Sequence, residues 1–126
     1  MRFMTIIKSA EDFGVGPPPQ ELMEAVGRLS AEAAQAGVMV EMGGLLPSAA
    51  GVRVKLSRGK MTVLDGPFIE SKEVIGGYAV FSVGSKDEAI AWSRRMLELH
   101  LRHWPVWEGE IEVRQLADVL PCDACS

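Results

Sequence analysis

With 126 residues, the chain has the length of one ordinary domain, and 48% of its residues are hydrophobic, which suffices for one buried core. Its 13 Lys and Arg residues are outnumbered by 17 Asp and Glu residues and are scattered, so we expect no nucleic-acid binding. No apolar run approaches the roughly 18 residues of a membrane-spanning helix, and the N-terminus lacks the pattern of a secretion signal. We therefore expect a cytoplasmic protein without a membrane partner.

The first third of the chain predicts a strand, a helix and a second strand. Residues 2–8 alternate between two faces, as a strand does, and the glycines and prolines of residues 11–20 then predict a surface loop. From Gln20 onward, apolar residues recur every three or four positions, which predicts an amphipathic helix. Gly37 fits the C-terminal end of this helix, and residues 38–42 begin the next strand.

The rest of the chain predicts a hairpin, a buried strand, a helix and a last strand. Residues 52–56 and 61–64 flank the turn 57–60, and residues 74–83 are apolar at nearly every position, which predicts a central strand buried on both faces. Ser85 and Glu88 have the spacing of a capping box at the start of a helix that runs to about Arg102. Residues 110–114 alternate as a half-exposed final strand.

This order of elements predicts an α+β fold of the ferredoxin-like split βαβ type with an inserted β-hairpin. Such a sheet carries helices on one face only, yet two of the predicted strands are apolar on both faces. We therefore predict that a second subunit covers the open face, which gives a homodimer with the shape of a dimeric α/β barrel. One domain should span residues 1–117, and residues 118–126, with Cys122 and Cys125, should form a flexible tail.

The segment 65–78 combines turn formers, four charged side chains and a glycine pair between two strands. It resembles the DGPF signature of the YCII-related family. The resemblance covers residues 65–68, 70, 72–73, 76–78 and 88–89, and weaker similarity extends over residues 1–116. It implies a dimeric α+β barrel, a family in which most members have no established activity, and an association of some relatives with sigma factors.

Several residues of this segment are candidates for a ligand site. Asp65 starts a tight turn, where its carboxylate can bond backbone N–H groups or face a pocket as a base. Glu70 and Lys72 project to one side of an extended segment, where they form either a salt-bridged rim or an anion site. We predict Lys72 and Arg53 as anion-binding residues, with Phe68 and Glu70 beside them.

Further candidates lie outside the turn. Tyr78 is the only tyrosine, and its hydroxyl serves either a structural hydrogen bond or proton transfer. His100 and His103 lie three residues apart near the end of the second helix, where they either cap the helix or bind a metal ion. Because no third ligand is evident nearby, we predict no metal site.

The residues thus support two hypotheses about function. The first is a homodimer that binds a small polar or anionic molecule near residues 65–72, without a cofactor. If it is an enzyme, Asp65 would transfer the proton, and Tyr78 or His100 would orient the substrate. The second is a sensing module that binds a regulatory protein and catalyses nothing. Converging side chains around a cavity would favour the first hypothesis.

Overall fold

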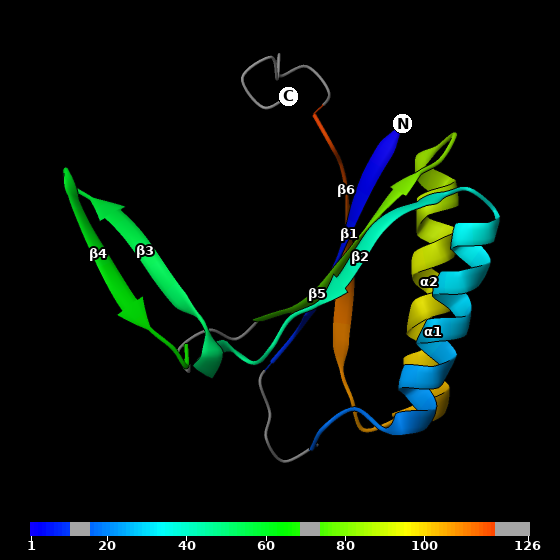
Figure 1. Ribbon diagram of the computed structural model, residues 1–126, viewed down its shortest axis with the longest axis horizontal. Coiled ribbons are helices and arrows are strands. Elements are labelled where there is room, and N and C mark those ends of the chain that lie inside the picture. The colour runs from blue at the N-terminus through cyan, green and yellow to red at the C-terminus, as the bar shows by residue number, and fades with distance from the viewer. Residues whose placement is uncertain (11–15, 69–73, 118–126) are drawn as a thin grey trace.

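Two helices pack on one face of a four-stranded antiparallel sheet, and a separate hairpin lies on the other side of that sheet (Figure 1). The structure is a computed structural model that describes residues 1–10, 16–68 and 74–117. It confirms the predicted α+β class. The elements are β1 (Arg2–Ser9), α1 (Gln20–Gln35), β2 (Met39–Gly44), the 3₁₀ turn η2 (Ser48–Ala50), β3 (Val52–Ser57), β4 (Lys60–Asp65), β5 (Val74–Ser82), α2 (Lys86–His103) and β6 (Gly109–Gln115).

The main sheet has the strand order β2-β5-β1-β6, so β5 is central, as its continuous apolar run predicts. Ile6 of β1 pairs with Tyr78 of β5 on one side and with Glu112 of β6 on the other. The prediction that β5 is buried on both faces is correct only for its second half. Ala79 to Phe81 are buried, whereas Ile75 is 44% exposed.

The helices begin where the sequence predicts. Ser85 Oγ accepts a hydrogen bond from the N–H of Glu88, and the Glu88 carboxylate accepts one from the N–H of Gly84, so a capping box starts α2. The guanidinium of Arg95 on α2 bonds both carboxylate oxygens of Glu32 on α1 and ties the helices together. Neither described helix is long and apolar enough to cross a membrane.

The helix-to-sheet contact depends on small side chains. Ala33 of α1 and Ala89 of α2 are fully buried, and Ala79 of β5 is 7% exposed. Because an alanine side chain is only a methyl group, the helix backbones approach the sheet closely at these positions. Larger neighbouring side chains then fill the core around this contact. The continuous core consists of Phe3, Ala33, Ala79, Phe81, Val83 and Ala89.

The hairpin of β3 and β4 has two different faces. Val54 pairs with Val63 and Leu56 with Met61, so these four apolar side chains share one face, and all are at least 65% exposed. Arg53, Lys55 and Thr62 alternate with them and lie on the opposite face. The connecting turn is Arg58-Gly59, where both residues have positive φ angles of 52° and 77°.

The start of β6 requires a residue without a side chain, which gives a test of the packing. A Cβ atom on Gly109 would lie 2.4 Å from the Trp107 ring and 2.5 Å from the Lys8 carbonyl oxygen. We expect Gly109→Ala to lower the free energy of unfolding by about 1–3 kcal/mol, because overpacking forces backbone shifts. Urea unfolding followed by circular dichroism measures this change.

The control is Gly27→Ala on the exposed side of α1, where a Cβ atom meets nothing within 4 Å. This substitution should raise the free energy of unfolding by about 0.5–1 kcal/mol, because alanine loses less backbone entropy in a helix. Wild-type stability in Gly109→Ala would contradict the close contact with Trp107.

Candidate functional site

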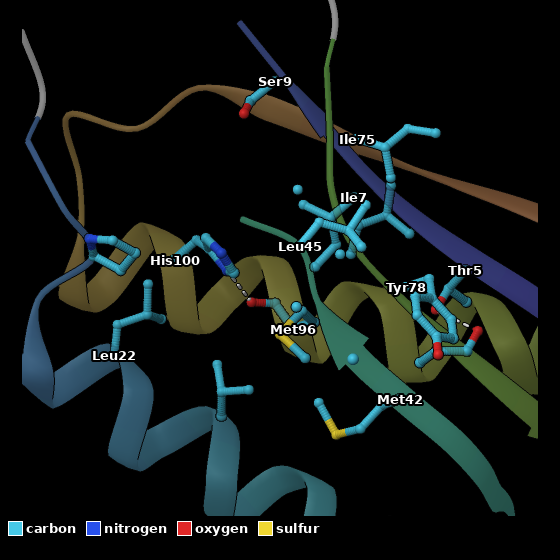
Figure 2. A pocket seen from close by; sticks show the side chains of 18 of the residues that line it. Thr5, Ile7, Ser9, Leu22, Met42, Leu45, Ile75, Tyr78, Met96 and His100 are labelled. Atoms are coloured by element: carbon cyan, nitrogen blue, oxygen red, sulfur yellow. Dashed lines mark hydrogen bonds between the residues drawn. The ribbon is translucent and has the colours of Figure 1, made fainter. Parts of the chain in front are cut away.

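A cavity of about 830 Å³ lies between the helices and the main sheet (Figure 2). Side chains from β1, α1, α2 and β5 line it, and its volume is within the range of roughly 300–1,000 Å³ that small-molecule sites occupy. Most of the wall is hydrocarbon, indole or thioether. Apolar residues of the wall include Ile7, Leu22, Val26, Leu29, Met96 and Trp104.

His100 supplies the ionisable group of the cavity wall on α2. The residue is buried, and its Nδ1 atom lies 2.9 Å from the carbonyl oxygen of Met96, one helical turn earlier (Figure 2). A carbonyl oxygen only accepts hydrogen bonds, so Nδ1 carries the proton of the neutral ring and Nε2 carries the lone pair. Burial lowers the pKa of His100 below its ordinary value of 6.5, against a smaller opposing effect of the Met96 carbonyl.

Two indole rings surround the imidazole. The ring centre of His100 lies 4.5 Å from that of Trp107 and 6.5 Å from that of Trp104. The two indoles are nearly parallel, with an interplanar angle of 23° and centres 6.3 Å apart. Backbone hydrogen bonds hold this group, since the N–H of Trp104 donates to His100 and the N–H of Trp107 donates to Trp104.

Most hydroxyl groups in the cavity wall already donate to the backbone. The hydroxyl of Thr5 donates to the carbonyl of Ala79 at 3.3 Å. The hydroxyls of Ser30 and Ser93 donate to carbonyls four residues earlier on their own helices. Ser9 also lines the cavity, and its hydroxyl is able to both donate and accept. Within the described ranges no residue bonds the Nε2 atom of His100, so this nitrogen is an unpaired acceptor in the wall.

Tyr78 also lines the cavity, but a carboxylate holds its hydroxyl. The Tyr78 hydroxyl donates to Glu41 of β2 at 2.9 Å, and this bond raises the pKa of Tyr78 above its ordinary value of 10.0. Its ring lies against Gly43, where an added Cβ atom would approach within 3.1 Å. Tyr78 and His100 lie well apart in the close-up view (Figure 2). The structural hydrogen bond considered for Tyr78 is therefore present.

A second, smaller hollow lies at the base of the hairpin. The guanidinium of Arg53 stacks 3.9 Å above the ring of Phe68, and the N–H of Phe68 donates to the hydroxyl of Ser48 at 3.0 Å. Gly66 packs so tightly on this loop that a Cβ atom would lie 1.7 Å from the Ser48 carbonyl oxygen. The turn of residues 65–68 thus has a structural role in attaching the hairpin.

The structure describes only some of the residues that the sequence suggests as one site. It brings Arg53 and Phe68 together, but Asp65 is an exposed residue at the end of β4. Glu70 and Lys72 lie outside the described residues, as do Cys122 and Cys125. His100 belongs to the cavity instead.

The two histidines of α2 also separate. His100 faces the cavity, whereas His103 Nδ1 lies 3.8 Å from a carboxylate oxygen of Glu21 on α1. In the part of the chain that the structure describes, no three His, Cys, Asp or Glu side chains form a group that could hold a metal ion.

Sequence reasoning missed most of the cavity wall. Leu22 and Leu29 are two of the apolar residues whose spacing predicts α1. Both lie on its buried face, but they also border the cavity. The available signal was a histidine on the inner side of α2 next to two tryptophans. That pattern does not show whether side chains of the facing strand fill the space beside this histidine or leave it empty.

The buried imidazole predicts a loss of stability in mild acid. Because the pKa of His100 is lowered on folding, the unfolded chain takes up a proton more readily, so this group's contribution is complete above about pH 6.5 and is lost as the pH falls through its lower folded pKa. We expect the melting temperature to fall from about pH 7 toward pH 5, and His100→Gln to weaken this dependence.

The matched control is His103→Gln on the same helix, which should keep the pH dependence of the wild type. Equal pH profiles for both variants and the wild type would contradict the role of His100.

Comparison with known proteins identifies the family of the chain. The family model of the YCII-related domain matches residues 1–100. An uncharacterized protein of Rhizobium meliloti (strain 1021) is 29% identical over 98 residues, which are 78% of this chain and 75% of that protein. The match extends from β1 into α2 and includes the DGPF segment whose resemblance the sequence suggests. The chain belongs to the YCII-related family.

Proposed function

We propose that this protein binds a small, mainly apolar organic molecule in the cavity between its helices and its sheet. The observation that carries this proposal is a cavity of about 830 Å³ whose wall is mainly apolar. An apolar cavity holds little ordered water. A hydrocarbon group that enters it therefore gains contacts without displacing strongly hydrogen-bonded water.

The apolar wall of the cavity favours a different class of ligand from the one that the sequence suggests. Residues 65–72 favour a polar or anionic ligand, but of the predicted anion-binding residues the structure describes only Arg53, which stacks on Phe68 at the other hollow. No lysine or arginine belongs to the described wall of the cavity. An anion there would lose its hydration without a charged partner, so the cavity favours a neutral ligand.

Catalytic roles remain predictions. Asp65 is exposed and does not line the cavity, so it would act only on a ligand bound at the base of the hairpin. Tyr78 donates to Glu41, which leaves its oxygen lone pairs for a ligand. His100 has the neutral, unbonded nitrogen that a general base needs.

We also propose that the chain forms a homodimer with a ferredoxin-like split βαβ fold in each subunit and a barrel between them. The antiparallel order β2-β5-β1-β6 with two helices on one face supports this topology. Met4 and Ile6 of β1 alternate with buried residues and lie half-exposed on the face without helices. A second sheet would cover them.

The hairpin gives further support for a second copy. A two-stranded ribbon is marginally stable alone, and its face of Val54, Leu56, Met61 and Val63 is exposed. Residues 52–65 carry four basic residues and one acidic residue, a formal charge of +3, which leaves −7 on the rest of the chain. A basic, apolar arm thus fits an acidic body of the same sequence. A regulatory protein on this face is the alternative.

Ligand binding is testable with naphthalene as an apolar probe. Isothermal titration of the wild type should give a Kd below about 100 μM, which is the range for a probe of this size in a dry pocket. Val26→Trp should weaken binding at least about tenfold, because the indole would fill the cavity that Val26 lines.

Ala31→Trp adds the same indole to the exposed side of α1 and should leave naphthalene binding unchanged. Equal affinities of the two variants, or no binding to the wild type, would rule out the cavity as the site.

The dimer is testable with two neighbouring hairpin residues that lie on opposite faces. Val63→Lys and Thr62→Lys add the same charge, but only Val63 belongs to the apolar face. Light scattering should give twice the chain mass of 13.7 kDa for the wild type. Val63→Lys should weaken association at least about tenfold, because a symmetric interface buries the substituted position twice.

Thr62→Lys should remain dimeric. A monomeric wild type at micromolar concentration would reject the dimer, and a monomer that retains a protein partner through Val63 would support the regulatory alternative.

A further inference from the structure

We propose that the cavity selects a flat aromatic or conjugated molecule that carries an acidic hydroxyl group, such as a phenol or an enol, and that His100 accepts the hydrogen bond from this hydroxyl. This inference rests on the proposed function, since it names the chemical class of the ligand in that cavity. Three features of the wall carry it: the orientation of the imidazole, the occupied hydroxyls and the indole pair.

The orientation of His100 sets which partner it accepts. Its Nδ1–H is held by the Met96 carbonyl at 2.9 Å, so the neutral ring cannot donate a second hydrogen bond. The free Nε2 atom therefore needs a donor from the ligand. A carboxylate offers only lone pairs, so it would leave Nε2 without a donor. The lowered pKa of His100 keeps the ring neutral near pH 7 and so maintains this selectivity.

The remaining polar groups do not supply that donor. The hydroxyls of Thr5, Ser30 and Ser93 already donate to backbone carbonyls. Among the described residues every buried side-chain nitrogen and oxygen atom has a hydrogen-bond partner. No described side chain donates to Nε2, so this nitrogen is not sealed inside the core and borders open space. A ligand hydroxyl that reaches this nitrogen would satisfy an acceptor that the fold itself leaves unpaired.

The aromatic rings around His100 set the shape of the ligand. Trp107 lies 4.5 Å from the imidazole, and Trp104 and Trp107 are nearly parallel. Flat rings pack on such surfaces with offset stacking or edge contacts, whereas a branched aliphatic molecule matches them poorly. Met96 adds a deformable thioether beside the imidazole. A planar hydroxylated molecule meets both the ring surfaces and the acceptor.

Four naphthalene probes test this inference on the full chain: naphthalene, 2-naphthol, 2-methoxynaphthalene and 2-naphthoate. They share the ring system and differ in whether the substituent donates. We expect 2-naphthol to bind about tenfold more tightly than 2-methoxynaphthalene, and 2-naphthoate to bind more weakly than 2-naphthol. Isothermal titration near pH 7 gives the four affinities.

The variant His100→Phe removes the acceptor and keeps a flat ring. It should abolish the preference for 2-naphthol over 2-methoxynaphthalene, and this ratio is measured on one variant, so a change in the packing of the shared ring system does not affect it. The control His103→Phe changes the other histidine of α2, which does not line the cavity, and should keep the preference.

Nitrogen NMR of wild-type protein with ¹⁵N-labelled histidine needs no variant. The resonance of the unprotonated nitrogen of one histidine should shift on addition of 2-naphthol and not on addition of 2-methoxynaphthalene. Equal affinities for these two probes, an unshifted resonance, or tightest binding of 2-naphthoate would overturn the inference while the cavity remains a binding site. Failure of all four probes to bind would overturn the proposed function itself.

Discussion

The packing of two helices on one face of an antiparallel sheet is the constraint on which the other features depend. Small side chains at Ala33, Ala79 and Ala89 bring the helices close to the sheet at the core. Along β5 the next inward position is Gly77, which has no side chain to fill the space between the layers. The same layer arrangement therefore produces a dense core in one region and a cavity in another.

The uncovered face of the sheet follows from the same constraint. Helices that cover one face leave Met4 and Ile6 half-exposed on the other, and the hairpin extends on that side without packing its own apolar ribbon (Figure 1). Both surfaces consist of residues that normally become buried. A second copy of the chain, as we propose, would bury the apolar face of the hairpin and the open face of the sheet in one interface.

Much of the fold follows from the sequence because local rules decide it. Periodicity places β1 and α1 within one or two residues of their observed bounds, and Ser85 with Glu88 marks the start of α2. The candidate site is harder to predict. Asp65 and His100 are both ionisable residues in the sequence. Only the packing of the chain shows that Asp65 is exposed and that His100 is buried.

The sequence by itself determined the α+β class, the order of strands and helices, and membership of the YCII-related family, because these depend on local periodicity and on a long signature. The tertiary structure decided the rest. It gave the turn of residues 65–68 a structural role at the base of the hairpin. It also placed His100, with its unpaired nitrogen, in the wall of an apolar cavity. Burial and hydrogen-bond partners arise from contacts between residues far apart in the chain, so periodicity cannot specify them.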